Sequence, residues 1–137
     1  MTADEVRVLS ANEGFYEAFS DRDLERMDGL WARERPVTCI HPGWSMLVGR
    51  ERVMASWRAI LESNDVQLEC SGARAFVAGE SAYVVCYEAA RGQQPFLIAT
   101  NVFASEDCGW RMVHHHAGQL ARPGDPLEEE EVEAGTN

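Results

Sequence analysis

Four histidines are the side chains of this 137-residue chain best suited to proton transfer near neutral pH, and three of them are consecutive. His114, His115 and His116 fall in the stretch MVHHHAG, whereas His41 stands alone in VTCIHPGW. Side chains alternate between the faces of a strand, so His114 and His116 share one face and His115 lies on the other. The three rings cannot converge on one ion, and no third ligand accompanies His114 and His116. We therefore expect no metal site.

The cysteines and the remaining motifs argue against other cofactor chemistry. Cys39, Cys70, Cys86 and Cys108 are widely spaced and form no C-x-x-C pair, which favours free thiols in a reducing compartment. There is no glycine-rich phosphate loop or dinucleotide fingerprint, so we expect no cofactor. The N-terminus lacks the layout of a signal peptide, and no apolar run approaches the roughly 20 residues of a membrane span. These features predict a cytoplasmic protein that does not associate with a membrane.

The charge distribution excludes one large class of partner. The formal net charge is −11, whereas nucleic-acid binding requires a basic surface. Residues 123–137 hold six acidic side chains and no basic one, a composition typical of disorder. We therefore expect a single domain over residues 1–121, followed by an acidic, disordered tail over residues 122–137.

The order of hydrophobic patterns predicts an α+β fold. Apolar residues recur at helical spacing over 3–20, 22–34 and 50–62, with a short strand at 37–41 between the second and third segments. From residue 65 the pattern changes to period two. It predicts strands at 65–71, 73–79, 81–90, 95–105 and 109–118. Helices followed by successive strands indicate a curved antiparallel sheet that is covered by helices on one face.

The strand PFLIATNVFAS indicates that the second face of the sheet is covered as well. Phe96, Ile98 and Val102 lie on one face, while Leu97 and Phe103 lie on the other. A sheet with one solvated face should alternate more clearly between apolar and polar residues. We expect a second copy of the chain to cover the outer face, which would make the protein a homodimer.

Four motifs together resemble a known superfamily. They are FYEAFSDRDLERMDGLWA (15–32), VTCIHPGW (37–44), GRERVMASW (49–57) and GWRMVHHHAG (109–118). Their order resembles the nuclear transport factor 2-like superfamily, and most closely its SnoaL-like and ketosteroid-isomerase-like bacterial members. The fragment TCIHP, with the last strand, also resembles the association domain of calcium/calmodulin-dependent protein kinase II. The resemblance implies a cone-shaped sheet wrapped around three N-terminal helices, with a deep pocket and usually a dimer.

The resemblance also assigns positions within that pocket. His41 stands where ketosteroid isomerase has its aspartate base. Phe15 replaces the tyrosine that stabilises the enolate, and Ala99 falls at or near the second, acidic donor. Trp31 and Trp57 replace supporting tyrosines. Because the donors are lost, the resemblance implies that this protein is not a true ketosteroid isomerase.

These positions predict an apolar cavity for a small hydrophobic molecule. His41 would act as the base of a cofactor-independent isomerase, cyclase, dehydratase or hydrolase, and His115 or Asn101 would polarise a carbonyl or orient water. The alternative is a non-catalytic ligand-binding or dimerisation module, in which His41 bonds the backbone and Asn101 is a satisfied buried amide. The residues expected to line the cavity are Phe15, Trp31, Trp44, Trp57, Val85, Tyr87 and Ala99.

Overall fold

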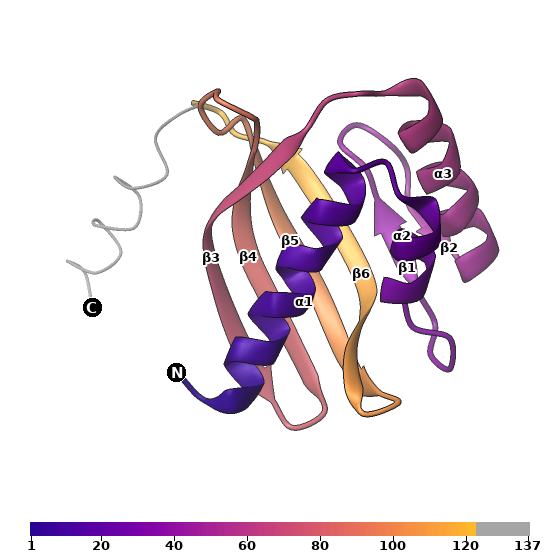
Figure 1. Cartoon of the computed structure of the whole chain (residues 1–137), viewed down its shortest axis with the longest axis vertical. Helices are drawn as coiled ribbons and strands as arrows, with labels where there is room; N and C mark the ends of the chain where they lie inside the picture. Colours follow the sequence, from indigo (N-terminus) through magenta and orange to yellow (C-terminus); the bar gives the residue numbers. More distant parts are fainter. Residues whose placement is uncertain (123–137) are drawn as a thin grey trace.

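The computed structural model describes residues 1–122 as three helices packed on one face of an open six-stranded sheet (Figure 1). This α+β architecture confirms the predicted fold class. The strands are ordered β2-β1-β6-β5-β4-β3. The elements are α1 (Ala3–Ser20), α2 (Leu24–Leu30), β1 (Thr38–Ile40), β2 (Leu47–Val48), α3 (Arg50–Ser63), β3 (Leu68–Ala78), β4 (Ser81–Ala90), β5 (Leu97–Glu106) and β6 (Gly109–Gln119). The predicted disorder of the acidic tail concerns residues that lie outside the described range.

Helix α1 runs across the inner face of the sheet (Figure 1). It begins with a capping box, in which the Thr2 side chain accepts from the Glu5 amide and the Glu5 carboxylate accepts from the Thr2 amide. Its buried face includes Val8, Phe15 and Phe19. Burial of this stripe against the sheet fixes the orientation of the helix.

The sheet differs from the prediction in four ways, and its strand β2 lies where no strand is predicted. It is mixed rather than wholly antiparallel, because β1 pairs in parallel with β6. The strands expected at 65–71 and 73–79 are one strand, β3, with a register irregularity between Ser71 and Arg74. A second irregularity, opposite the bond between Val102 and Phe103, shifts β6 so that Phe103 pairs with Met112. Met112 is consequently buried, although strict alternation places it on the outer face with His114.

No helix within residues 1–122 is long and apolar enough to cross a membrane.

Candidate functional site

His41 is fixed by the turn that ends strand β1. The strand stops at Ile40, and Pro42 and Gly43 follow His41. Gly43 has a φ of +82°, a conformation that glycine adopts without steric cost. The Trp44 amide then donates to the His41 carbonyl at 2.9 Å. This turn brings the Trp44 ring against the His41 imidazole, with the ring centroids 4.7 Å apart.

Helix α3 supplies the other wall around His41 and sets its tautomer. The Trp57 ring lies edge-on to the imidazole, with a centroid distance of 4.6 Å. The Ser56 hydroxyl donates to the Val53 carbonyl at 2.7 Å and lies 2.9 Å from Nε2 of His41. Because that hydroxyl has already used its proton, it accepts from Nε2–H of His41. Nδ1 of His41 is therefore the unprotonated nitrogen.

The register of the sheet brings His115 into the same site. Cys39 of β1 pairs with His115 of β6, so His41, two residues beyond Cys39 in the chain, lies close to His115. The ring centroids of His41 and His115 are 6.4 Å apart. His115 faces the helices, as strand alternation predicts, and is 3% exposed. Two histidines that are distant in sequence thus meet on the inner face.

Asn101 positions His115 rather than facing a ligand. It lies directly opposite His115 in the pairing of β5 with β6, and its Oδ1 is 2.6 Å from Nδ1 of His115. The Asn101 amide nitrogen donates to Asn12 at 2.8 Å and to the Tyr16 hydroxyl at 3.2 Å. Oδ1 of Asn101 accepts the Nδ1 proton of His115, which leaves Nε2 of His115 as an acceptor.

This chain of hydrogen bonds ends on a buried carboxyl group. The Tyr16 hydroxyl donates to Oε2 of Glu88 at 2.5 Å. Glu88 is on the inner face of β4 and is only 2% exposed. The donors point in one direction, from the Asn101 amide to Tyr16 and from Tyr16 to Glu88. The Glu88 carboxyl group is therefore the final acceptor of the network.

His41, His115 and Glu88 share a cavity of about 360 Å³. That volume is within the range of small-molecule sites. Its wall is drawn from α1, α3, the turn after β1 and the inner face of the sheet. The lining residues are Phe15, Phe19, His41, Pro42, Trp44, Trp57, Ile60, Asn64, Val66, Leu68, Glu88, Phe96, Leu97 and His115.

Burial shifts the pKa values of all three ionisable groups of the cavity in the direction that favours their neutral forms. It lowers the pKa of His41 to about 4. It lowers the pKa of His115 to about 3, and the neighbouring His41 adds a smaller effect in the same direction. It raises the pKa of Glu88 to about 7, against the opposing effect of the Tyr16 hydrogen bond. Both imidazoles are therefore neutral at physiological pH, and Glu88 titrates close to it.

Of the residues predicted for the site, five line the cavity: His41, His115, Phe15, Trp44 and Trp57. Five others are not among its lining residues. Asn101 and Ala99 are buried on the inner face of β5, and Trp31 is buried at the end of α2 next to Met112 of β6. Val85 and Tyr87 alternate with the buried residues of β4 and so face the outer side of the sheet.

Glu88 is the functional group that the sequence prediction missed. Its signal is present in strand β4, where Ala82, Val84 and Cys86 are buried at alternate positions and Glu88 continues the series. A carboxyl on the buried face of a strand is rare unless it is paired or functional. Phe19, Phe96 and Leu97 were also not assigned to the cavity.

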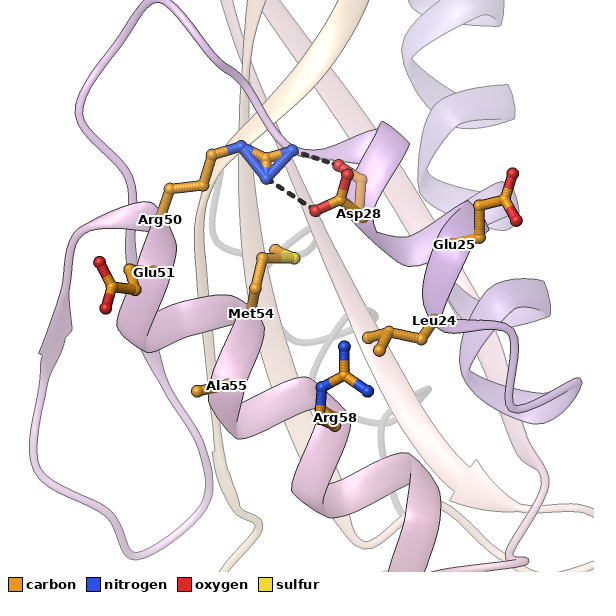
Figure 2. A pocket seen from close by; sticks show the side chains of 8 residues that line it. All are labelled: Leu24, Glu25, Asp28, Arg50, Glu51, Met54, Ala55 and Arg58. Carbon is orange, nitrogen blue, oxygen red and sulfur yellow. Dashed lines mark hydrogen bonds and ion pairs between the residues drawn. The ribbon is translucent and has the colours of Figure 1, made fainter.

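A larger but more open hollow lies between α2 and α3 (Figure 2). Its volume is about 680 Å³, and none of the predicted site residues lines it. Arg50 donates to the Asp28 carboxylate at 3.1 Å and also to the Asp28 backbone carbonyl (Figure 2). Within this hollow, Arg50 and Asp28 thus form an ion pair. Figure 2 also shows Met54 and Leu24 between the charged side chains, as at an ordinary contact between two surface helices.

Residues 1–122 contain no group of three or more histidine, cysteine or acidic side chains arranged to hold a metal ion. His114 and His116 lie with ring centroids 6.1 Å apart, and His114 Nδ1 is 2.6 Å from the Thr38 hydroxyl. His114 is thus engaged with the neighbouring strand β1.

The chain thus combines a mixed sheet, helices that cover its inner face, and a largely apolar cavity between them. The chain belongs to the SnoaL-like domain family, whose model matches residues 8–121. A candidate dehydratase of the NTF2-like family from Streptomyces avermitilis is 32% identical, with a TM-score of 0.78 over 87% of this chain and 97% of that one. A candidate calcium/calmodulin-dependent protein kinase type II association domain from Thiobacillus denitrificans is 34% identical, with a TM-score of 0.70 over 80% and 92%.

A similar sequence forms part of a longer plant protein. The F-box protein SKIP8 from Arabidopsis thaliana is 32% identical over 116 residues. The match covers 82% of this chain and 49% of the plant protein, so this chain spans about half the length of that curated relative. A candidate ketosteroid isomerase from Parabacteroides distasonis shares the fold, with a TM-score of 0.67 at 15% identity.

Proposed function

We propose that the protein binds a small, largely apolar molecule in the cavity and that His41 removes a proton from it. The observation that carries the proposal is the position of His41: it is 4% exposed and lies between Trp44 and Trp57 in the cavity wall. Its tautomer is fixed by Ser56, so Nδ1, which lies 3.9 Å from the Cys39 thiol, is unprotonated and can accept a proton. The similarity to a candidate dehydratase supports chemistry that begins with proton removal.

The basicity of His41 restricts the reactions that it can support. An imidazole with a pKa of about 4 is always in its accepting form at pH 7, but it is a weak base. It therefore suits a carbon acid whose proton is already acidified by a neighbouring carbonyl group. Isomerisation, cyclisation or dehydration of a carbonyl compound fits this requirement and needs no cofactor.

The same weak basicity favours the second candidate function, a module that binds its ligand without changing it. In that case His41 and His115 act only as hydrogen-bonding groups in an apolar cavity. The similarity to a candidate association domain supports this reading. The two functions differ in whether a bound carbonyl compound exchanges its acidic protons.

Deuterium exchange separates the two functions without knowledge of the natural substrate. The protein would be incubated with indanone in D₂O, and incorporation at the carbon next to the carbonyl followed by NMR. The enzyme reading predicts accelerated exchange that is lost in His41→Gln and kept in His116→Gln. His116 is the matched control, because it is an exposed histidine on the outer face of the same sheet. Binding of indanone without any accelerated exchange would establish the module instead.

We also propose that a second copy of the chain covers the outer face of the sheet. Phe76 and Tyr83 stack on this face with ring centroids 5.0 Å apart, yet they are 39% and 45% exposed. Val85, Tyr87 and Ile98 extend the apolar surface across β4 and β5. Pairing two such faces would remove this apolar area from water.

A further inference from the structure

The cavity contains one acidic group and no basic partner for it. Glu88 lines the cavity, and among its described lining residues there is no lysine or arginine. A buried carboxyl is normally paired with a cation or fully hydrogen-bonded. The Tyr16 hydroxyl engages Oε2 of Glu88 at 2.5 Å, so Oε1 is the oxygen that a bound molecule would meet.

The groups that pack around Glu88 cannot supply the missing positive charge. They are Tyr16 from α1, Cys70 from β3, Cys86 from β4 and, through Asn101, His115 from β6. Tyrosine and cysteine are never cationic, and burial keeps the His115 imidazole neutral by lowering its pKa to about 3. A cation that pairs with the ionised Glu88 carboxyl must therefore come from outside the chain.

The remaining wall of the cavity is suited to a cation with an apolar body. Phe15, Phe19, Trp44, Trp57 and Phe96 all contribute aromatic rings. The faces of aromatic rings attract ammonium groups, and their area buries hydrocarbon. The unprotonated ring nitrogens of His41 and His115 are hydrogen-bond acceptors, which match an N–H donor and offer nothing to an anion.

We propose that the ligand of this cavity is a hydrophobic amine, whose ammonium group binds the Glu88 carboxylate while its apolar part packs against the aromatic wall. The inference rests on the proposed function, because it assumes that the cavity takes a small molecule, and it adds the charge of that molecule. It also assigns a role to Tyr16 as a positioning residue. The hydroxyl of Tyr16 holds the carboxyl group at the cavity wall and stabilises its ionised form.

The test compares benzylamine with benzyl alcohol, which has the same apolar body and no charge, by isothermal titration calorimetry at about pH 8. Glu88→Gln keeps the shape of the side chain and removes its charge. Glu80→Gln, in the exposed turn between β3 and β4, removes the same charge far from Tyr16 and controls for the net charge of −11. We expect benzylamine to bind roughly tenfold more tightly than the alcohol, because a charge-assisted hydrogen bond is about twice as strong as a neutral one.

The preference for the amine should disappear in Glu88→Gln and persist in Glu80→Gln. It should also weaken at about pH 5, where the Glu88 carboxyl is protonated because its pKa is about 7. Equal binding of both probes, unchanged in Glu88→Gln, would overturn the inference and leave the apolar cavity intact. Tighter binding of the alcohol would show that Glu88 donates a proton to a neutral oxygen, which also overturns it. Failure of both probes to bind would count against the proposed function as well.

Discussion

Replacing Glu88 by glutamine should stabilise the protein, and it should do so far more at high pH than at low pH. Burial raises the pKa of Glu88 from the ordinary 4.5 to about 7. The folded state therefore holds the proton more tightly than the unfolded state does. This contribution to stability is fully present below pH 4.5 and is lost as the pH rises toward 7, because ionising the buried carboxyl has a cost.

The magnitude follows from the two pKa values. At about pH 8 the ionised carboxyl lowers the free energy of unfolding by about 3 kcal/mol, and at about pH 5 by less than about 1 kcal/mol. Glutamine does not titrate, so the free energy of unfolding of Glu88→Gln does not contain this decrease. Any change in packing is the same at both pH values, and the stronger Tyr16 hydrogen bond to the ionised carboxyl is already contained in the pKa of Glu88. The difference between the two pH values, about 2 to 3 kcal/mol, therefore isolates the titration.

Urea unfolding followed by tryptophan fluorescence measures this difference. The free energy of unfolding would be determined for the wild type, Glu88→Gln and the exposed control Glu80→Gln at both pH values, with the protein concentration held constant because assembly would shift the apparent stability. Equal effects of Glu88→Gln at pH 5 and pH 8 would refute the reasoning. They would mean that the carboxyl titrates as an ordinary glutamate and that the folded state does not resist its ionisation.

Three further predictions concern other parts of the site and the outer face. Burial lowers the pKa of His41 from 6.5 to about 4 in the folded state, so this group should lower the free energy of unfolding of the wild type by about 3 kcal/mol between pH 7 and pH 4. In His41→Gln, urea unfolding should show a smaller decrease in the free energy of unfolding over the same pH range. Asn101→Ala leaves the His115 Nδ1–H and the Asn12 acceptor unpaired, so it should lower the free energy of unfolding by about 2 to 3 kcal/mol. An unchanged midpoint of urea unfolding would contradict this expectation. Tyr83→Glu should convert a dimer to a monomer in sedimentation velocity with the fold intact by circular dichroism, and a wild type that sediments as a monomer would refute the proposed interface.

The sequence predicted those features of the fold that depend on local periodicity and on turn residues. The amphipathic stripes predicted all three helices, and strand alternation alone predicted that His115 faces inward while His114 and His116 do not. The Pro42-Gly43 pair predicted where the first strand ends and hence the position of His41.

The misplaced residues have two physical causes. The irregularity opposite Val102 and Phe103 adds a residue to β6, which turns Met112 inward, and nothing in the local pattern marks it. The transfer of pocket positions by resemblance placed Val85 and Tyr87 in the cavity, whereas the burial of their neighbours in β4 puts both on the outer face. The same alternation would have identified Glu88.

An NMR titration of the histidine rings, with His41→Gln used to assign one signal, tests the role proposed for His41. We expect His41 to have a pKa of about 4 and its ring signals to move when indanone is added, because a neutral imidazole in the cavity wall would contact a bound apolar molecule. A His41 that titrates near the ordinary 6.5 and does not respond to indanone would contradict both the environment and the role assigned to it.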